Sequence, residues 1–183
     1  MTALTRIHLD IDARVASIRE NHADWLCGKG CDNCCRRLAD VPQLTAVEWA
    51  LLRQGLAALA PEHLAEISRK MATLAEQPPR PVVCPLLDES TGACPVYAQR
   101  PVACRSYGFY VQRDLGLYCH DIEKLVAEGA LADVVWGNHD GIDQQLGALG
   151  EKHPLTEWFT GCFADARQDT APDRPNVLPQ KAV

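Results

Sequence analysis

The spacing of apolar side chains along the chain predicts a protein built mainly from helices. From Leu4 to Trp25, apolar residues recur at mostly three- and four-residue steps, which predicts one apolar stripe on a helix that runs up to the first cysteine. Thr45 followed by Glu48 has the form of a capping box and predicts the start of a second helix. The expected buried face of that helix consists of Val47, Leu51, Leu52, Leu56 and Leu59.

A third helix is expected to begin at Pro61, because proline suits a first helical turn, and to end in the proline-rich residues 77–81. Two helices joined by a short connection form an antiparallel hairpin, here over residues 44–77. Such a hairpin returns the chain to its starting point, so Cys84 is expected near Cys35. The apolar face of the third helix would be Leu64, Ile67, Met71 and Leu74.

Helical periodicity stops after the hairpin and resumes only near Asp121. Residues 82–119 are rich in turn residues and predict loops with short extended pieces. A helix from Asp121 through Val135 should follow, then a short one and a last turn. The apolar positions of these last two are Ile142, Leu146 and Leu149, then Leu155, Trp158 and Phe159.

The domain expected from this pattern covers residues 1–164. The segment from Asp165 onward has three prolines and few apolar residues, which predicts a flexible tail over residues 165–183. A hydrophobic fraction of 47% and a charged fraction of 23% are those of an ordinary globular protein. The net charge of -6 argues against a nucleic-acid partner. Charges interrupt the N-terminal segment every few residues, which predicts a cytoplasmic protein without a membrane span.

Nine cysteines change this picture, because eight of them fall into two groups. Cytoplasmic thiols are kept reduced, so such a pattern indicates metal binding or catalysis rather than disulfides. Gathered thiolates repel one another unless a cation neutralises them, and tetrahedral sulfur sites belong to zinc or to iron and sulfide. A single cysteine is often an ordinary core residue, and Cys162 is expected to be one. The two groups are Cys27, Cys31, Cys34 and Cys35, and then Cys84, Cys94, Cys104 and Cys119.

The first four cysteines are spaced as CxxxC and CxxCC rather than as the CxxC of many zinc knuckles. Neighbouring side chains point in different directions, so Cys34 and Cys35 serve two separate centres or divide ligation from another task. Backbone amides at Gly28 and Gly30 could donate to metal-bound sulfur. Basic residues beside the thiols could offset negative charge, namely Lys29, Arg36, Arg37, Arg100 and Arg105.

The segments CGKGCDNCC, CPLL and CPVYAQRPVACRSY, followed by Cys119, resemble the YkgJ-type cysteine cluster proteins, a family of zinc- or iron-chelating domains. The resemblance covers residues 27–119, about half of the chain. Members are labelled iron–sulfur or zinc proteins, and a related domain occurs in the longer flagellin lysine N-methylases. The additional sequence of those enzymes is not expected in this chain, so the resemblance does not imply a methylase. The resemblance implies eight metal ligands, Cys27, Cys31, Cys34, Cys35, Cys84, Cys94, Cys104 and Cys119.

The expected architecture is therefore a mainly α fold in which the helical hairpin packs beside an irregular, cysteine-rich lobe stapled by metal. Three functions remain open: a redox protein with an iron–sulfur cluster, a zinc-stabilised module for a protein partner, and a metal carrier. We favour iron and sulfide over zinc as the cofactor. Whether the protein is an enzyme stays open, as does its protein or small-molecule partner. Further chemistry could come from Arg105, Tyr107, Tyr110, His120 and His139, each of which also has an ordinary structural explanation.

Overall fold

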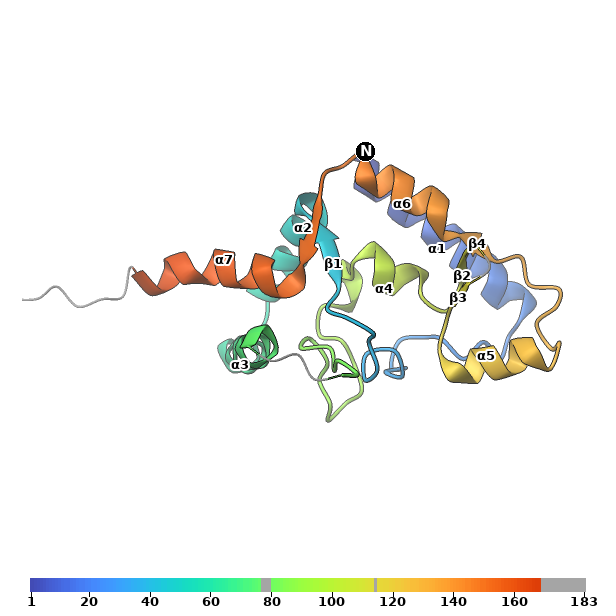
Figure 1. Cartoon of the computed structure of the whole chain (residues 1–183), viewed down its shortest axis with the longest axis horizontal. Coiled ribbons are helices and arrows are strands. Elements are labelled where there is room, and N and C mark those ends of the chain that lie inside the picture. Colours follow the sequence, from blue (N-terminus) through green and yellow to red (C-terminus); the bar gives the residue numbers. More distant parts are fainter. Residues whose placement is uncertain (77–79, 114, 169–183) are drawn as a thin grey trace, which may run out of the picture.

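The computed structural model describes residues 1–76, 80–113 and 115–168, and these residues form a mainly helical fold (Figure 1). The mainly α prediction is confirmed. The helices are α1 (Ala3–Asn21), α2 (Ala46–Ala57), α3 (Pro61–Glu76), a 3-10 helix η1 (Tyr97–Gln99), α4 (Val102–Ser106), α5 (His120–Ala127), α6 (His139–Gly147) and α7 (Leu155–Gln168).

Short strands tie together segments that are far apart in the sequence. Strand β1 (Gln43–Thr45) pairs antiparallel with β5 (Lys152–Pro154). Strand β2 (Tyr110–Gln112) pairs antiparallel with β3 (Leu115–Leu117) and parallel with β4 (Gly137–Asn138). The C-terminal third of the chain is thereby joined to the first quarter through β1 and to the middle through β2.

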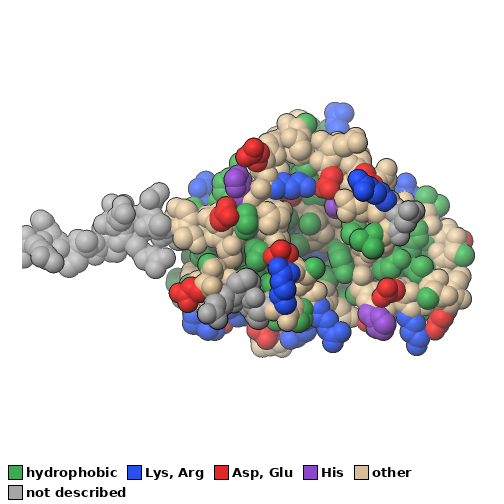
Figure 2. All heavy atoms as spheres, in the orientation of Figure 1, with side chains coloured by type: hydrophobic (Ala, Val, Ile, Leu, Met, Phe, Trp, Pro, Cys, Tyr) green, Lys and Arg blue, Asp and Glu red, His purple; other side chains and the backbone are tan. Residues whose placement is uncertain are grey.

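Two hydrophobic cores lie side by side, with α4 between them (Figure 1). The α1 core consists of Leu4, Ile7, Ile11, Ile18, Val102, Phe109, Tyr110, Ile122, Leu131, Val134, Ile142 and Leu146. The α2 core consists of Val41, Leu44, Trp49, Leu52, Leu56, Ile67, Met71, Leu74, Val82, Cys84, Leu86, Leu87, Val96, Leu155 and Phe159. Over the face shown in Figure 2, acidic and basic side chains are interspersed around this interior.

Helix α1 ends four residues earlier than its apolar stripe suggests. Thr2 caps its start by accepting a hydrogen bond from the Thr5 backbone amide at 3.1 Å, and the helix ends at Asn21. Trp25 therefore lies beyond the helix, so the prediction was wrong for this residue. Trp25 still reaches the α1 core, where its ring stacks on Phe109 with the centroids 5.6 Å apart.

Helix α2 begins with the predicted capping box, in which Glu48 accepts the Thr45 backbone amide at 2.9 Å. Val47, however, is 40% exposed. Because an α-helix turns about 100° per residue, Val47 lies on nearly the opposite side from the buried Trp49 and Leu52. The expected burial of Val47 was wrong for that reason.

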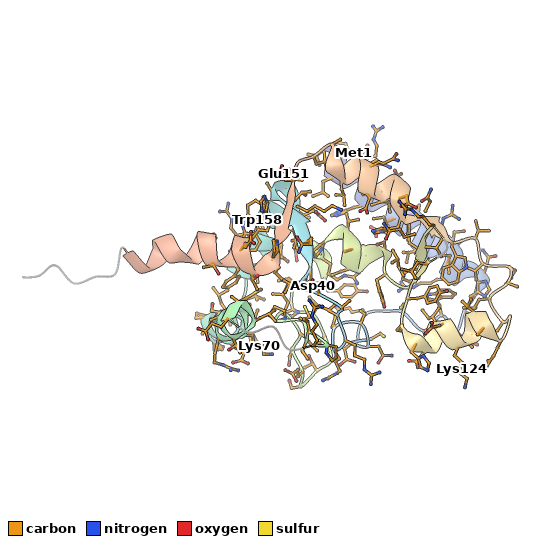
Figure 3. All side chains as sticks on the ribbon, viewed as in Figure 1. Met1, Asp40, Lys70, Lys124, Glu151 and Trp158 are labelled. Atoms are coloured by element: carbon orange, nitrogen blue, oxygen red, sulfur yellow. The ribbon has the colours of Figure 1, made fainter. Side chains whose placement is uncertain are left out.

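Helices α2 and α3 are joined by only three residues and contribute to one core, but α3 packs most extensively against α7. Trp158 on α7, labelled in Figure 3, donates a hydrogen bond from its indole nitrogen to the Leu44 carbonyl of β1 at 2.9 Å. The predicted return of the chain to Cys35 is confirmed, but the predicted hairpin was wrong in its packing, because α3 lies against α7 and makes few contacts with α2. Leu38 and Val82 form an antiparallel bridge, and the Cys84 amide donates to the Cys35 carbonyl at 2.7 Å.

The segment between α3 and α5 has only short regular pieces, as predicted. The helix predicted over 121–135 was wrong in its end, because α5 stops at Ala127. Gly129 follows with a left-handed φ of 77°, the usual glycine position just beyond a helix end.

The C-terminal part differs from the expected tail at its start. Helix α7 continues to Gln168, so residues 165–168 of that predicted tail are helical, and residues 169–183 lie outside the described residues. In the described part of the chain, no helix combines the length and apolar character needed to cross a membrane.

Candidate metal centre

Eight cysteines from four parts of the chain line three cavities that share lining residues. In this region the loops after α1 and α3 approach α4 and α5 (Figure 1). Cys104 lies on α4, and Cys119 is the residue that precedes the first turn of α5. All of the cysteines are free thiols. The structure thus brings together the sulfur atoms that the sequence placed in two distant groups.

The first thiol group consists of Cys27, Cys31, Cys34 and Cys119. Burial raises the pKa of Cys27 to about 12, and the charges of Cys31, Cys119 and Cys34 contribute to this rise. Cys27 and Cys119 pack against the α1 core. This group therefore lies on the side of the molecule built from α1, α5 and α6.

The second thiol group consists of Cys35, Cys84, Cys94 and Cys104. A hydrogen bond with Cys34 lowers the pKa of Cys35, but a hydrogen bond with Cys84, burial, and the charges of Cys84 and Cys94 together raise it to about 12. Burial, followed by the charges of Cys35, Cys34 and Cys94, raises the pKa of Cys104 to about 12. Cys84 belongs to the α2 core, and Cys35 and Cys94 pack against it.

Cys34 and Cys35 join the two groups, with their Sγ atoms 4.0 Å apart. The hydrogen bond with Cys35, followed by burial, raises the pKa of Cys34. The charge of Cys34 also raises the pKa of Cys27 in the first group and the pKa of Cys104 in the second. Cys34 therefore stands at the junction, while Cys35 belongs to the second group.

Two cavities of similar size adjoin these thiols. The aliphatic cavity, about 270 Å³, is lined by the whole second thiol group, by Cys31 and Cys34, and by Leu38, Leu52, Leu86, Leu87 and Val96. The arginine cavity, also about 270 Å³, is lined by Cys27, Cys31, Cys34 and Cys104, by Arg19, Arg100 and Arg105, and by Tyr97, Tyr107 and Phe109. The two cavities share six lining residues, namely Cys31, Cys34, Cys104, Tyr97, Arg100 and Tyr107.

A turn between Cys84 and Cys94 is closed by the side chain of Asp88. This carboxylate accepts the Ser90 amide at 2.9 Å, the Ser90 hydroxyl at 2.6 Å and the Thr91 hydroxyl at 2.8 Å. These hydrogen bonds, led by that of the Ser90 side chain, lower the pKa of Asp88 to about 2. The turn fixes the two cysteines that flank it.

Two residues that sequence reasoning did not assign to the site hold its backbone. Gly108 has a left-handed φ of 88°, and a methyl group at this position would overlap the Cys27 Sγ atom. Buried Glu48 accepts the Val102 amide at 3.0 Å and so anchors the start of α4, which carries Cys104. The capping box indicated only the local role of Glu48, and glycine between aromatic residues was the available signal for Gly108.

The basic residues divide between the cavity and the surface. Arg100 and Arg105 line the arginine cavity, as their position beside the thiols suggested. Arg36 instead pairs with Asp32 at 2.7 Å. Arg37 lines a smaller cavity with Cys34 and Cys119, and Lys29 is exposed. Arg19 was missed, although a basic residue in the last turn of a helix that leads to a cysteine was a usable signal.

Of the candidates for further chemistry, Tyr107 lies closest to the thiols. Its hydroxyl donates to the Tyr118 carbonyl at 2.8 Å, and burial, followed by the charges of Cys34 and Cys119, raises its pKa to about 12. Tyr110 is buried in the α1 core. The His120 side chain is 80% exposed, so its side chain faces solvent.

His139 and Cys162 lie at other places in the fold. His139 starts α6, where its Nδ1 is 3.4 Å from the Ser106 hydroxyl and its Nε2 is 3.5 Å from the Asp143 carboxylate. Cys162 is only partly buried against the α2 core, with its Sγ 3.9 Å from Arg53. The expectation of a core position for Cys162 is met in part.

The donor set suits a soft or borderline metal, because it consists of thiols brought together without disulfides. Among the described residues, no three His, Cys, Asp or Glu side chains already stand in an arrangement that could hold one metal ion. The thiols of each group are thus near one another, but their sulfur atoms do not surround one common metal position. Ligation would require side-chain rotation in each group.

Comparison with known proteins identifies a family. The family model CxxCxxCC, described as a putative zinc- or iron-chelating domain, matches residues 26–125, more than half of the chain. No curated protein and no solved structure gives a match. The match spans both thiol groups and agrees with the resemblance seen in the cysteine spacing. The chain belongs to the CxxCxxCC family of zinc- or iron-chelating domains.

Proposed function

We propose that the protein binds metal in two centres, one in each thiol group, and that the metal form is an iron–sulfur cluster. The observation that carries this proposal is the division of eight thiols into two sets of four, joined at Cys34 and Cys35. Four cysteine ligands are the usual complement of an iron–sulfur cluster. The adjacent Cys34 and Cys35 would supply one ligand to each centre after side-chain rotation.

Metal binding also supplies a reason for the buried sulfur. The pKa values of Cys27, Cys35 and Cys104 are raised to about 12, so without metal these thiols stay protonated near neutral pH. Ligation displaces those protons and neutralises the resulting charge with the metal. The free energy of metal binding would then order loops that have few regular hydrogen bonds of their own.

Iron and sulfide are favoured by the surroundings of the thiols. Aliphatic side chains lie around the second thiol group, and Arg100 lies near Cys94 and Cys104. Burial and nearby charge are among the properties that set the reduction potential of a cluster. Four thiolates per centre leave no open position for a substrate, so electron transfer suits these centres better than Lewis-acid catalysis. Reduced thiols suit a reducing compartment such as the cytoplasm.

A zinc module is the second candidate, and the even division of the thiols favours it. Structural zinc sites are closed and take four ligands per ion, so two ions would use all eight cysteines. Such a protein would use metal only to hold its loops in place for a protein partner.

Metal analysis of the full chain tests both candidates. The protein is purified without oxygen, and iron, sulfide and zinc are quantified together with the visible spectrum. The iron–sulfur proposal predicts iron, sulfide and visible absorption that bleaches on reduction. Two equivalents of zinc without sulfide would contradict that proposal and favour the zinc module.

Three variants test the division into two centres. Cys119→Ser should remove metal only from the first thiol group and Cys84→Ser only from the second, so each should keep about half of the wild-type metal. Cys162→Ser is the control and should keep all of it. Complete loss of metal in both Cys119→Ser and Cys84→Ser would instead indicate one shared centre.

A further inference from the structure

We propose that the arginine cavity is a binding site for a small anionic ligand that carries a carboxylate or phosphate group. The cavity lies beside the first thiol group and has a volume of about 270 Å³. This volume is at the small end for ligand sites in proteins and suits an organic acid or a phosphate rather than a nucleotide.

Positive charge is in excess around this cavity. Arg19, Arg100 and Arg105 line it together with a single carboxylate, that of Asp12. Asp12 pairs with Arg105 at 3.4 Å. In the described part of the chain, neither Arg19 nor Arg100 forms an ion pair with a carboxylate. The interspersed charges of the face in Figure 2 contrast with this concentration of three cations.

The guanidinium groups are held in place before any ligand arrives. Arg100 lies 3.4 Å from the centroid of the Tyr97 ring and donates from its Nε to the Tyr97 carbonyl at 3.0 Å. Arg105 donates from its Nε to the Arg100 carbonyl at 3.0 Å and also donates to the Ala98 carbonyl. Its side chain is only 12% exposed. Side chains fixed in this way lose little entropy when they bind an anion.

Arg19 is also fixed in place by its contacts. It donates to the Cys27 carbonyl at 2.7 Å and lies 5.2 Å from the centroid of the Phe109 ring. These contacts use only part of the five N–H donors of a guanidinium, and the remaining donors suit the two oxygens of a carboxylate or phosphate. Arg19 and Arg100 therefore present unused donors to one cavity.

The competing role for these arginines is to offset thiolate charge. Arg19 lowers the pKa of Cys27, and Arg100 lowers the pKa values of Cys94 and Cys104, although burial dominates in each case. The hydrogen bonds of these arginines go to backbone carbonyls rather than to the thiols. Arg19 donates to the Cys27 carbonyl at 2.7 Å, and Arg100 donates to the Cys104 carbonyl at 3.4 Å. The inference does not rest on which metal is bound. It requires only that the guanidinium groups keep capacity for an added anion.

Titration calorimetry on the full-length, metal-loaded protein tests the site with inorganic phosphate and with malonate in separate experiments. We expect saturable binding of at least one anion with one site per chain, and the stronger of the two identifies the ligand class. Arg100→Gln and Arg19→Gln should each weaken binding by roughly tenfold or more, because each removes charge-assisted hydrogen bonds. Arg69→Gln, which removes an exposed arginine of α3 that pairs with Glu66, is the control and should bind as the wild type does.

The metal content of every variant is measured in parallel, so a failure of the metal centres is seen separately from a failure of the anion site. If Arg100→Gln loses metal, Arg19→Gln decides the result. Absence of saturable binding of both anions to the metal-loaded wild type would overturn the inference. Binding that neither Arg19→Gln nor Arg100→Gln weakens would overturn it too.

Discussion

The two thiol groups contain the same number of cysteines but lie in different surroundings. The first group adjoins the α1 core and a cavity lined by arginines and aromatic rings. The second adjoins the α2 core and a cavity whose lining includes four leucines and a valine as well as cysteines. Lys124 on α5 and Lys70 on α3, on either side of the central loops in Figure 3, mark the two sides.

This difference shows how one loop can serve two environments. Cys34 and Cys35 are chain neighbours, yet Cys35 packs against the α2 core while Cys34 lines the arginine cavity. Charge and hydration near a metal-bound sulfur influence both its affinity and its reduction potential. Two centres of equal ligand composition would therefore differ in stability and reactivity.

The largest effect is expected from Glu48, which supports α4 between the two groups. Glu48→Ala leaves the buried Val102 and Thr45 amides without their acceptor. Because unpaired buried polar groups are costly, we expect a loss of about 3 kcal/mol in the free energy of unfolding. Urea denaturation of the metal-free protein measures this loss.

Glu66→Ala is the matched control, because Glu66 forms only exposed ion pairs with Arg69 and Lys70. It should change the free energy of unfolding by less than about 0.5 kcal/mol. Equal effects of the two substitutions would show that Glu48 contributes no more than a surface residue.

A selective effect on the first thiol group is expected from Gly108→Ala. The new methyl group would displace the Cys27 side chain, and the left-handed φ of 88° adds strain of about 1 kcal/mol. Metal bound by the first group should be lost, while that bound by the second should remain. Elemental analysis and spectroscopy measure the retained fraction.

Gly147→Ala serves as the control for that experiment. Gly147 ends α6, and an added methyl group there meets no neighbour within 4 Å. This variant should keep its full metal content. Equal loss of metal from both thiol groups in Gly108→Ala would contradict the independence of the two groups.

Alkaline pH should destabilise the metal-free protein. The folded-state pKa values of Cys27, Cys35 and Cys104 are raised from 9.0 to about 12, so between these values the unfolded chain releases protons that the folded chain retains. The free energy of unfolding should therefore fall as the pH rises from 9 toward 12. Urea denaturation at a series of pH values measures the slope. Stability that stays constant or rises above pH 9 would disagree with the buried, protonated thiols.

The smallest effect concerns His8, on the α1 side of the molecule. Its Nε2 is buried and has no hydrogen-bond partner among the described residues. Burial, assisted by Arg105, lowers the pKa of His8 from 6.5 to about 4. The unfolded chain then binds a proton that the folded chain does not, so stability should fall as the pH drops from 6.5 toward 4.

The His8→Gln variant should lose less stability than the wild type between pH 7 and pH 5. Thermal unfolding at both pH values provides the comparison, with His63→Gln on exposed α3 as the control. If both variants keep the wild-type pH dependence, His8 does not become protonated on unfolding in this range.

Local features of the fold could be predicted from the sequence because they depend on neighbouring residues. Apolar periodicity located α1, α2 and α3, and the pair of Thr45 and Glu48 located a helix start. Predictions failed where distant packing decided the outcome, as at Trp25, which leaves α1 to stack on Phe109. The predicted burial of Val47 was wrong because an apolar residue near a helix start need not face the core.

By itself, the sequence determined the mainly helical composition, the family of the chain, the eight cysteines of its cluster and the approach of Cys84 to Cys35. Only the tertiary structure decided how those thiols divide, which arginines face them, and why residue 108 must be glycine. The physical reason is how far apart in the sequence the interacting residues lie. Helix starts and turns follow from interactions within a few residues, whereas the surroundings of each sulfur depend on how two separate cores pack against the same loop.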